Sequence, residues 1–314
     1  MGKYALRRLL QMIPVLVIVS ILIFAIIHLI PGNPAEIMAG PNATDEQLAA
    51  LNHQYGLDQP LWTQYFIWIK NVLGGNLGTS FINGFPVGKL IMQRIPATVE
   101  LALAAALIGL LISFPLGIIS ALKPGSFIDF FTTLFSALSF AVPSFWLAIL
   151  LILLFSLHFK ALPPSGRPVF SEDPGGHLKS LIMPALTLGI AMAAKLTRYL
   201  RSSMLDVLNQ DYTRTARAKG LSESTVVIRH AIRNALIPVV TVFGLQVGDL
   251  LSGAIIVESI FAWPGVGRLT IQAIGWRDYS ILQASVMFIV LAFLTVNLLT
   301  DLTYGLINPR IRYE

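Results

Sequence analysis

Apolar and polar residues follow one another along this chain in long blocks, and the blocks predict membrane-spanning helices. Each of six apolar runs is close to the roughly 20 residues that a helix needs to cross a hydrocarbon core about 30 Å thick. These runs occupy residues 12–30, 97–122, 131–159, 181–199, 234–257 and 281–299. The pattern therefore predicts an all-α integral membrane protein with six transmembrane helices.

The polar segment after the first run predicts small surface helices. Thr44 precedes a helical repeat of apolar residues that ends at Gly56, and a second repeat with spacing near four begins at Leu61. We expect this amphipathic unit within residues 31–96 to lie on the outer membrane surface. Residues 160–180 show no helical period, so we interpret them as a loop.

The distribution of charge predicts which segments face the cytoplasm. The chain is 55% hydrophobic and 12% charged, and 14 of its 22 Lys and Arg residues fall on one side if the N-terminus is inside. Eight of them lie between Lys195 and Arg233, and cytoplasmic segments carry such an excess. Both termini are therefore expected in the cytoplasm. The first run is longer than a signal-peptide core and lacks a clean cleavage site, which favours a retained span.

The residue types present exclude several kinds of chemistry. With no cysteine, there is no disulfide framework, thiolate metal site or cysteine nucleophile. HExxH, GxSxG and paired-carboxylate motifs are missing, and residues 84–90 are one residue too short for a phosphate loop. Anionic lipid explains the net charge of +6 without nucleic acid. We expect a non-enzymatic chain that binds no metal and no cofactor.

Ionisable residues inside spans are functional candidates by default. Asp249 lies deep in the fifth apolar run, and cavity lining and an interhelical hydrogen bond are equally open for it. Glu100, Glu258 and Asp301 lie near the ends of runs, where we interpret them as solvated at the interface. A proton-coupled transporter would need several buried groups, so one deep carboxylate disfavours that class.

Small residues recur in the spans at the spacing that lets helix backbones approach closely. They form the pairs Ala105 with Gly109, Gly189 with Ala193, and Gly244 with Gly248. We favour packing inside the bundle over a subunit interface for these pairs. Pro115, Pro143 and Pro184 are expected to interrupt their spans.

The most polar stretch of the second half, residues 211–225, predicts two helical segments separated by glycine; we call it the elbow. Asp206, Asn209 or Asp211 can cap the first segment, and Gly220 can close it in a left-handed conformation. Leu208, Tyr212 and Ala216 have the spacing of one helix face, and Ile228, Ile232 and Ala235 that of another, after a cap at Ser222. Docking in a partner's groove and binding to lipid alone both fit this pattern.

The elbow resembles the cytoplasmic coupling loop of permease subunits of type I ABC importers. Aligned on Gly220, that family's E-A-A-x-x-x-G motif keeps Ala216 and Gly220 but has Arg214 in place of Glu. The peptide/nickel branch instead has the form Y-x-R-T-A-R-A-K-G-L. This chain carries that form in Tyr212, Arg214, Thr215, Ala216, Arg217, Ala218, Lys219, Gly220 and Leu221.

Further motifs typical of the branch follow in order along the chain, at residues 4–9, 31–34, 55–60, 201–208, 230–238, 263–268 and 308–312. The chain is therefore similar to the B-type permeases that import dipeptides, oligopeptides, nickel chelates or glutathione. The resemblance implies a type I ABC importer permease fold with a cytoplasmic coupling helix and an extracytoplasmic loop after the first span. It divides the chain into residues 1–93, a transmembrane domain at 94–303 with the coupling loop at about 206–235, and a tail at 304–314.

The same resemblance implies partners. A homologous second permease, two ATPase subunits that bind ATP and Mg, and an extracytoplasmic solute-binding protein would assemble with this chain in a bacterial or archaeal plasma membrane. The elbow would pass ATP-driven closure to the spans. An ion-coupled secondary transporter and an intramembrane enzyme are the alternatives that the residues disfavour.

A short turn after the fifth run is a second candidate site, which we call the outer turn. Its residues are Trp263, Pro264, Gly265, Val266, Gly267 and Arg268. Trp263 can be an interfacial anchor and Arg268 a solvated charge, as is common at membrane interfaces. Alternatively, Trp263 packs at an outer gate and Arg268 contacts a binding protein or Glu258.

Overall fold

The computed structural model describes residues 2–29, 34–39, 43–54 and 56–307. Motif residues 31–33, 55 and 308–312 lie outside this part of the chain. Within it, the regular elements are helices, and the one extended pairing is an isolated bridge between Thr79 and Pro86.

In the described part of the chain, five helices are each long and apolar enough to cross a membrane. They are α1 (Gly2–Leu29), α5 (Val87–Leu122), α8 (Pro174–Leu208), α11 (Arg233–Ile260) and α13 (Tyr279–Ile307). Most extend several residues past the predicted apolar runs, because a helix does not need an apolar sequence once it leaves the hydrocarbon. Helix α8 begins at Pro174, so the second part of the predicted loop 160–180 is helical.

The third predicted span is broken. Helix α6 (Phe127–Ala141) and the continuous pair α7 (Ser144–Leu151) and η1 (Ile152–His158) meet at an angle of 104°. Proline disfavours the helical conformation of the residue before it. Val142, which precedes Pro143, is accordingly extended. Pro115 and Pro184 remain inside continuous helices, so the prediction that they interrupt spans is wrong.

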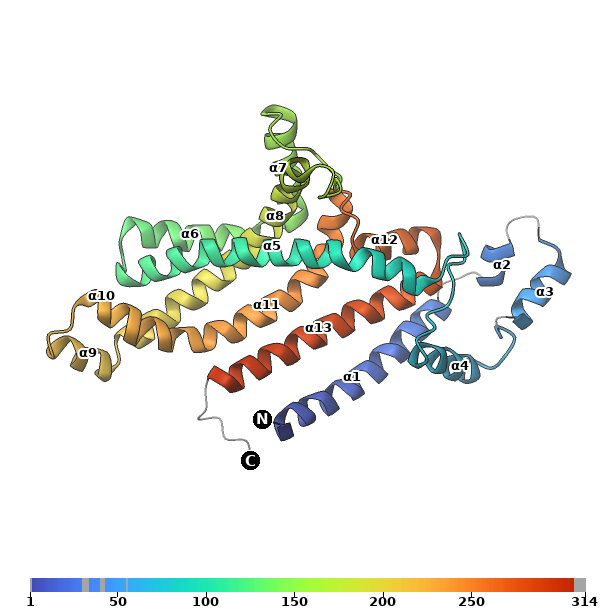
Figure 1. Ribbon diagram of the computed structural model, residues 1–314, viewed down its shortest axis with the longest axis horizontal. Coiled ribbons are helices and arrows are strands. Elements are labelled where there is room, and N and C mark those ends of the chain that lie inside the picture. The colour runs from blue at the N-terminus through green and yellow to red at the C-terminus, as the bar shows by residue number, and fades with distance from the viewer. Residues whose placement is uncertain (1, 30–33, 40–42, 55, 308–314) are drawn as a thin grey trace.

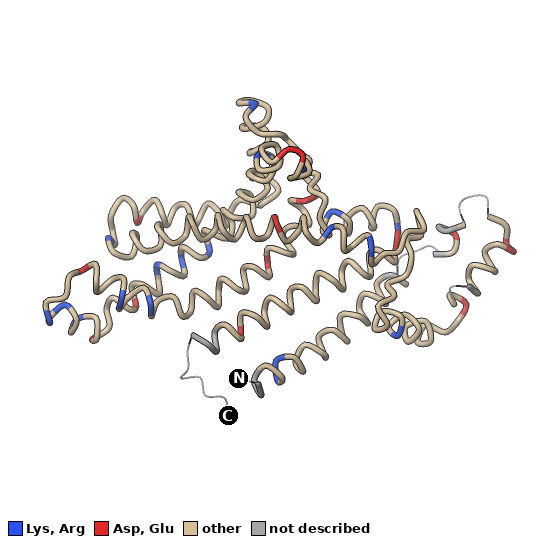
Figure 2. The backbone as a smooth tube through the Cα atoms, in the orientation of Figure 1, with Lys and Arg blue, Asp and Glu red and all other residues tan. Residues whose placement is uncertain are grey.

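The long helices lie side by side, as Figure 1 shows, with α1 next to α13 and α11 between α13 and α5. The elbow lies at one end of this bundle, on the same side as the first turns of α1 and the last turns of α13. Helices α4 (Leu61–Leu73) and α12 (Val266–Trp276) lie toward the opposite end, and α7 projects from the middle of the bundle. Lys and Arg positions gather on the turns of the elbow (Figure 2).

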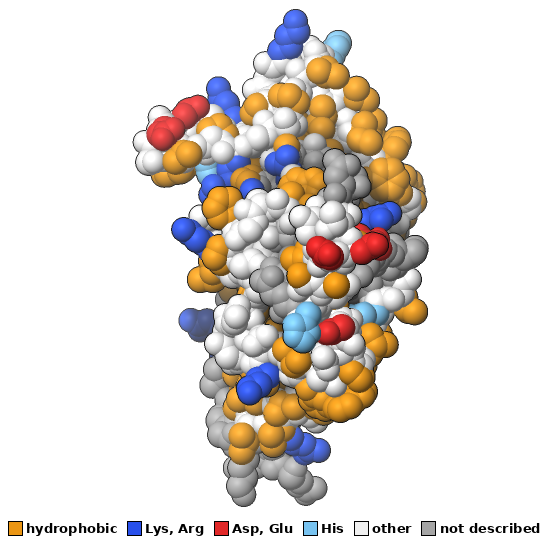
Figure 3. Space-filling view, turned by 90° about the vertical axis from the view of Figure 1, so that its right-hand side faces the viewer, with side chains coloured by type: hydrophobic (Ala, Val, Ile, Leu, Met, Phe, Trp, Pro, Cys, Tyr) orange, Lys and Arg blue, Asp and Glu red, His pale blue; other side chains and the backbone are white. Residues whose placement is uncertain are grey.

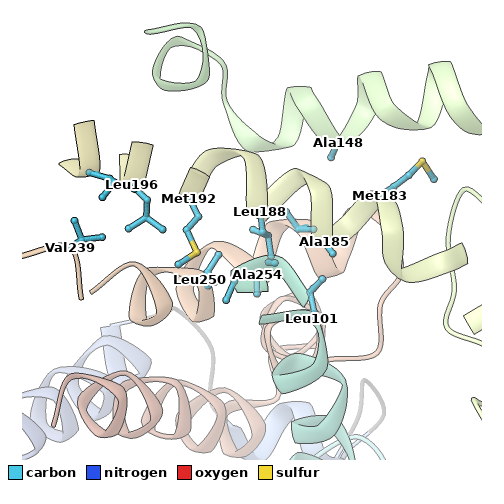
Figure 4. Packing of buried hydrophobic residues seen from close by; sticks show 14 of the residues in the cluster. Leu101, Ala148, Met183, Ala185, Leu188, Met192, Leu196, Val239, Leu250 and Ala254 are labelled. Carbon is cyan, nitrogen blue, oxygen red and sulfur yellow. The ribbon is translucent and has the colours of Figure 1, made fainter. Parts of the chain in front are cut away.

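The main apolar core joins α5, α7, α8 and α11 (Figure 4). Added Cβ atoms at Gly109 and Gly189 would lie 3.0 Å from Met192 and 2.8 Å from Ile108, so small residues let α5 and α8 touch. Gly244 and Gly248 meet α13 in the same way. The prediction that these small pairs pack inside the bundle is confirmed.

Three small helices form the amphipathic unit after α1: α2 (Pro34–Ala39), α3 (Asp45–Gln54) and α4 (Leu61–Leu73). Thr44 and Gln47 exchange side-chain-to-backbone hydrogen bonds at the start of α3, which is a capping box. Trp62 and Phe66 of α4 stay more than 60% exposed. Charged and apolar side chains are interspersed on this end of the molecule (Figure 3).

Candidate functional site

The elbow consists of α9 (Asp211–Ala218), a tight turn, and α10 (Glu223–Thr225), which continues through the π-helix η2 (Val226–Ile232) into α11. Gly220 has φ of +79°, and its N–H donates to Arg217 O across 2.9 Å. The N–H of Leu221 donates to Ala216 O across 3.4 Å. This pair of bonds is a Schellman closure, so the predicted left-handed role of Gly220 is confirmed.

The buried side of α9 differs from the predicted one. Thr213 is fully buried and Ala216 is 7% exposed, and the Thr213 hydroxyl donates to Val207 O across 2.9 Å. Leu208 belongs to α8, which ends before α9 begins, so the predicted face of Leu208, Tyr212 and Ala216 is wrong. The residue at the N-cap of α9 is Gln210, and it makes no side-chain cap. Helix α9 therefore rests on the bundle through two small residues.

The second predicted face is also wrong. Ile228 is 65% exposed, whereas Ala231 and Ala235 are fully buried. Residues 226–232 form a π-helix, whose i→i+5 hydrogen bonds widen each turn and shift the side chains away from α-helical spacing. Ser222 occupies the N-cap of α10 without a side-chain bond to the backbone, so its predicted capping is not observed.

Further side-chain contacts hold the elbow in shape. Arg217 donates two hydrogen bonds to the carboxylate of Glu223, at 3.0 and 2.7 Å, and so ties α9 to α10. This carboxylate raises the pKa of the Arg217 guanidinium above its usual value. Asn234 of α11 donates to the hydroxyl of Tyr212 across 3.2 Å. Arg214, Thr215, Ala218, Lys219 and Leu221 remain exposed.

The outer turn has the opposite character, because its aromatic residue points inward. Trp263 is fully buried, and its indole N–H donates to Ala97 O of α5 across 2.8 Å. A residue of a membrane-interface belt would face lipid headgroups, so that interpretation of Trp263 is wrong. The guanidinium of Arg268 donates to Ala262 O across 2.6 Å, and Arg268 is therefore not a free solvated charge.

The carboxylate of Glu258 lies at the centre of the outer turn. It is fully buried and accepts hydrogen bonds from the Thr98 hydroxyl at 2.7 Å and from the backbone N–H of Arg268 at 2.9 Å. Arg268 is in the first turn of α12 (Val266–Trp276), a helix that the apolar pattern of the sequence does not predict. A carboxylate is favourable at a helix N-terminus. The expectation that Glu258 is solvated at the interface is wrong.

A second polar cluster, also missed from the sequence, covers the outer turn. Glu100 of α5 accepts hydrogen bonds from Arg167 at 2.9 and 2.6 Å and is bonded to the buried ring of His177. The Arg167 guanidinium lies 5.5 Å from the centre of the Trp263 ring. Glu100 is 67 positions from Arg167 and 77 from His177 along the chain, and no local pattern in the sequence brings them together.

Asp249 contacts a neighbouring helix through an ion pair, whereas its predicted place in a cavity stays a prediction. Its carboxylate is 3.5 Å from the Lys195 ammonium group of α8 and accepts from Gln246 across 3.3 Å, so it has an interhelical partner. Its side chain is nevertheless 57% exposed. Among the described residues, no group of three or more His, Asp or Glu side chains could hold a metal ion.

Comparison with known proteins defines the family. Residues 113–313 match the family described as the binding-protein-dependent transport system inner membrane component, and residues 1–102 match the N-terminal region described for such membrane components. The chain therefore belongs to the binding-protein-dependent inner membrane transport components, and it is a multi-pass membrane permease subunit.

Full-length relatives and solved structures agree with this assignment. The chain is 41% identical to the dipeptide transport system permease protein DppB of Escherichia coli (strain K12), and 43% identical to the glutathione transport system permease protein GsiC of Salmonella typhimurium. Both alignments cover 100% of each protein. Inward-facing MetNI methionine ABC transporter structures share the fold, with a TM-score of 0.56 at 14% identity over 70% of this chain and 96% of that chain. The predicted type I ABC importer permease fold is thus confirmed.

Proposed function

We propose that this chain forms half of the translocation pathway of an ATP-driven, binding-protein-dependent importer of di- and oligopeptides. The coupling role rests on one observation: the polar face of the elbow stays exposed beyond the ends of α8 and α11. Such an exposed short helix suits insertion into a groove of a partner. The peptide class rests on the relatives named for dipeptide transport.

The partners in this proposal are a homologous second permease, two ATPase subunits and an extracytoplasmic solute-binding protein. ATP and Mg bind to the ATPases, so the chain itself is mechanical and not catalytic. Closure of the ATPases pushes on α9, and the Arg217–Glu223 contact passes the push to α10 and η2. Because η2 continues into α11, the push reaches a span directly.

The outer turn is proposed as the rim of the pathway on the side of the binding protein. Trp263 packs behind the rim, and the half-buried Arg268 lies at its surface. The turn joins α5, α11 and α12 through Ala97, Glu258 and Val266. A movement of α11 that begins at the elbow would therefore displace this rim.

The coupling role is tested by Gly220→Val. A left-handed conformation costs a residue with a side chain roughly 1–2 kcal/mol, so valine reshapes the turn. Uptake of dipeptide and co-purification of the ATPases should both fall, while the permease still reaches the membrane. Gly75→Val is the matched control, because Gly75 has φ of +80° and, like Gly220, open space around it. Equal uptake and equal ATPase recovery in the two variants would refute the proposal.

The proposed orientation has both termini and the elbow in the cytoplasm. A reporter that is active only in the cytoplasm should be active when fused after Ser222 and silent when fused after Pro164. The reverse result would show that the elbow lies outside the cytoplasm, where ATP is absent, and would refute the coupling proposal.

Glutathione is the second candidate substrate, because the chain is 43% identical to permeases named for glutathione transport. Vesicles that contain the assembled transporter and its binding protein separate the two. Glutathione would be the preferred substrate if an excess of it abolishes the uptake of labelled dialanine and if glutathione is itself taken up faster.

A further inference from the structure

An ion pair lies on an open face of the helix bundle. Lys195 Nζ of α8 is 3.5 Å from Asp249 Oδ2 of α11, and Gln246 Nε2 donates to the same oxygen across 3.3 Å. The two charged side chains remain 37% and 57% exposed. Compared with the pair between Arg201 and the largely buried Asp129, this one leaves both charges open to a further partner.

Asp249 lies inside the long helix α11, 11 positions before its last residue, Ile260, which corresponds to roughly 16 Å along a helix. It follows Arg233, the first residue of α11, by 16 positions, which corresponds to roughly 24 Å along a helix. The residues that share its face, Leu245, Ser252 and Ile256, are exposed as well. The open face therefore continues along α11 for about one turn before the carboxylate and about two turns after it.

Such a face cannot be covered by lipid at low cost. A charged side chain at the centre of a membrane-spanning helix costs roughly 2.5–3.5 kcal/mol and almost always faces the bundle interior or a water-filled cavity. A tightly packed apolar partner would bury those parts of the two charged groups that the ion pair leaves exposed, at a similar cost. A water-filled pathway removes both penalties.

The two charges match the two ends of a peptide. At neutral pH a free dipeptide carries an ammonium group at one end and a carboxylate at the other. We propose that Asp249 and Gln246 bind the ammonium end and that Lys195 binds the carboxylate end of a zwitterionic peptide during its passage. This inference rests on the proposed function as a peptide importer, and it names the feature of the substrate that the pathway recognises.

The internal ion pair between Lys195 and Asp249 competes with the substrate and so lowers its binding affinity. Lysine has a flexible four-carbon stem, so its ammonium group can turn from Asp249 to the substrate. Binding replaces one internal ion pair by two pairs with the substrate, and release restores the internal pair. A pathway site has to bind strongly enough for the solute to enter and weakly enough for it to leave.

The test measures binding of dialanine to the purified, assembled transporter without its binding protein, by equilibrium dialysis. N-acetylated dialanine lacks the ammonium group, and dialanine amide lacks the carboxylate. The unmodified transporter should bind dialanine at least about tenfold more tightly than either blocked form, since each loses one ion pair. Asp249→Asn should lose the preference over the acetylated form, and Lys195→Gln the preference over the amide.

Two further variants separate recognition from structure. Asp249→Glu keeps the carboxylate and should keep the preference over the acetylated form, even if Asp249→Asn assembles poorly. Asp301→Asn breaks the pair of Arg8 and Asp301, whose exposure is comparable, and should keep both preferences.

Each negative result has a separate meaning. Unchanged preferences in Asp249→Asn and Lys195→Gln would overturn the zwitterion site while leaving peptide import intact. Both variants could instead lose the second permease, while the transporters that remain assembled keep both binding preferences. This result would show that the ion pair is a contact between subunits, and it would also overturn the site. A complete transporter that takes up no peptide in the presence of ATP and loaded binding protein would refute the proposed function itself.

Discussion

The elbow and the outer turn both follow the end of a long helix, and both combine glycine with charged residues. They differ in which side chains are buried. In the elbow, buried contacts come from the small residues Thr213 and Ala216, while most charged side chains point into solvent. In the outer turn, the large ring of Trp263 and the carboxylate of Glu258 are fully buried.

The difference follows from what covers each region. The elbow extends past the end of the bundle and contacts α8 and η2 on one side only. The outer turn lies between α5, α12 and the loop before α8, which supplies Arg167 above Trp263. An exposed unit can change partners without unfolding, whereas a covered unit transmits force because its helices cannot move independently. The difference supports the proposed docking role of the elbow and the proposed linking role of the outer turn.

The largest effect is expected from Trp263→Ala. Removing a buried Trp side chain typically costs 3–5 kcal/mol, and here the Ala97 carbonyl also loses its donor. The detergent-solubilised protein should lose its monodisperse chromatographic peak at a clearly lower temperature. Trp62→Ala, at a residue 67% exposed, is the control and should shift this temperature little. Equal shifts in the two variants would contradict the linkage role of the outer turn.

A smaller loss of stability is expected from Gly265→Ala. Its Cβ atom would lie 2.1 Å from Glu258 Oε1, so the buried carboxylate has to move away from the start of α12. Overpacking of this kind costs about 1–3 kcal/mol. Gly275→Ala at the other end of α12 meets open space and should be neutral in the same thermal assay. If Gly265→Ala is also neutral, Glu258 does not hold the turn rigidly.

The smallest effect on stability is expected from Arg217→Ala in the elbow. Its pair with Glu223 is exposed, and exposed pairs contribute about 0.2–1 kcal/mol. Thermal stability should change by no more than this, and the difference should shrink in high salt, which screens surface charges. Glu223→Gln should behave alike. A loss as large as that of Trp263→Ala would mean that the elbow is part of the core.

Several features of the fold are readable because they depend on local sequence. The apolar runs at 97–122 and 234–257 mark helices α5 and α11, and the closure of α9 at Gly220 follows from glycine's access to positive φ. Thr44 likewise marks the start of α3. The motif in residues 212–221 carried the family resemblance, and the full-length comparisons agree with it.

Other features escaped prediction because they depend on distant residues. Helix α12 starts where it does because Glu258, Thr98 and the buried Trp263 surround its first turn. The π-helix η2 moved Ile228 outward, and no residue type in 226–232 marks that change of period. The boundaries of the three predicted regions, and the roles of Asp249 and Arg268, stay predictions.

The sequence by itself determined the class of this protein, since length and hydrophobicity of a run decide whether a helix can cross a membrane, and since a polar block between runs must meet water. Only the tertiary structure decided which charged groups are buried and which remain open. Glu258 and Asp249 are both acidic residues of α11, nine positions apart. The first is enclosed because α5 and α12 pack over it, and the second faces outward with Lys195, because packing geometry and not residue type sets the surroundings of a charge.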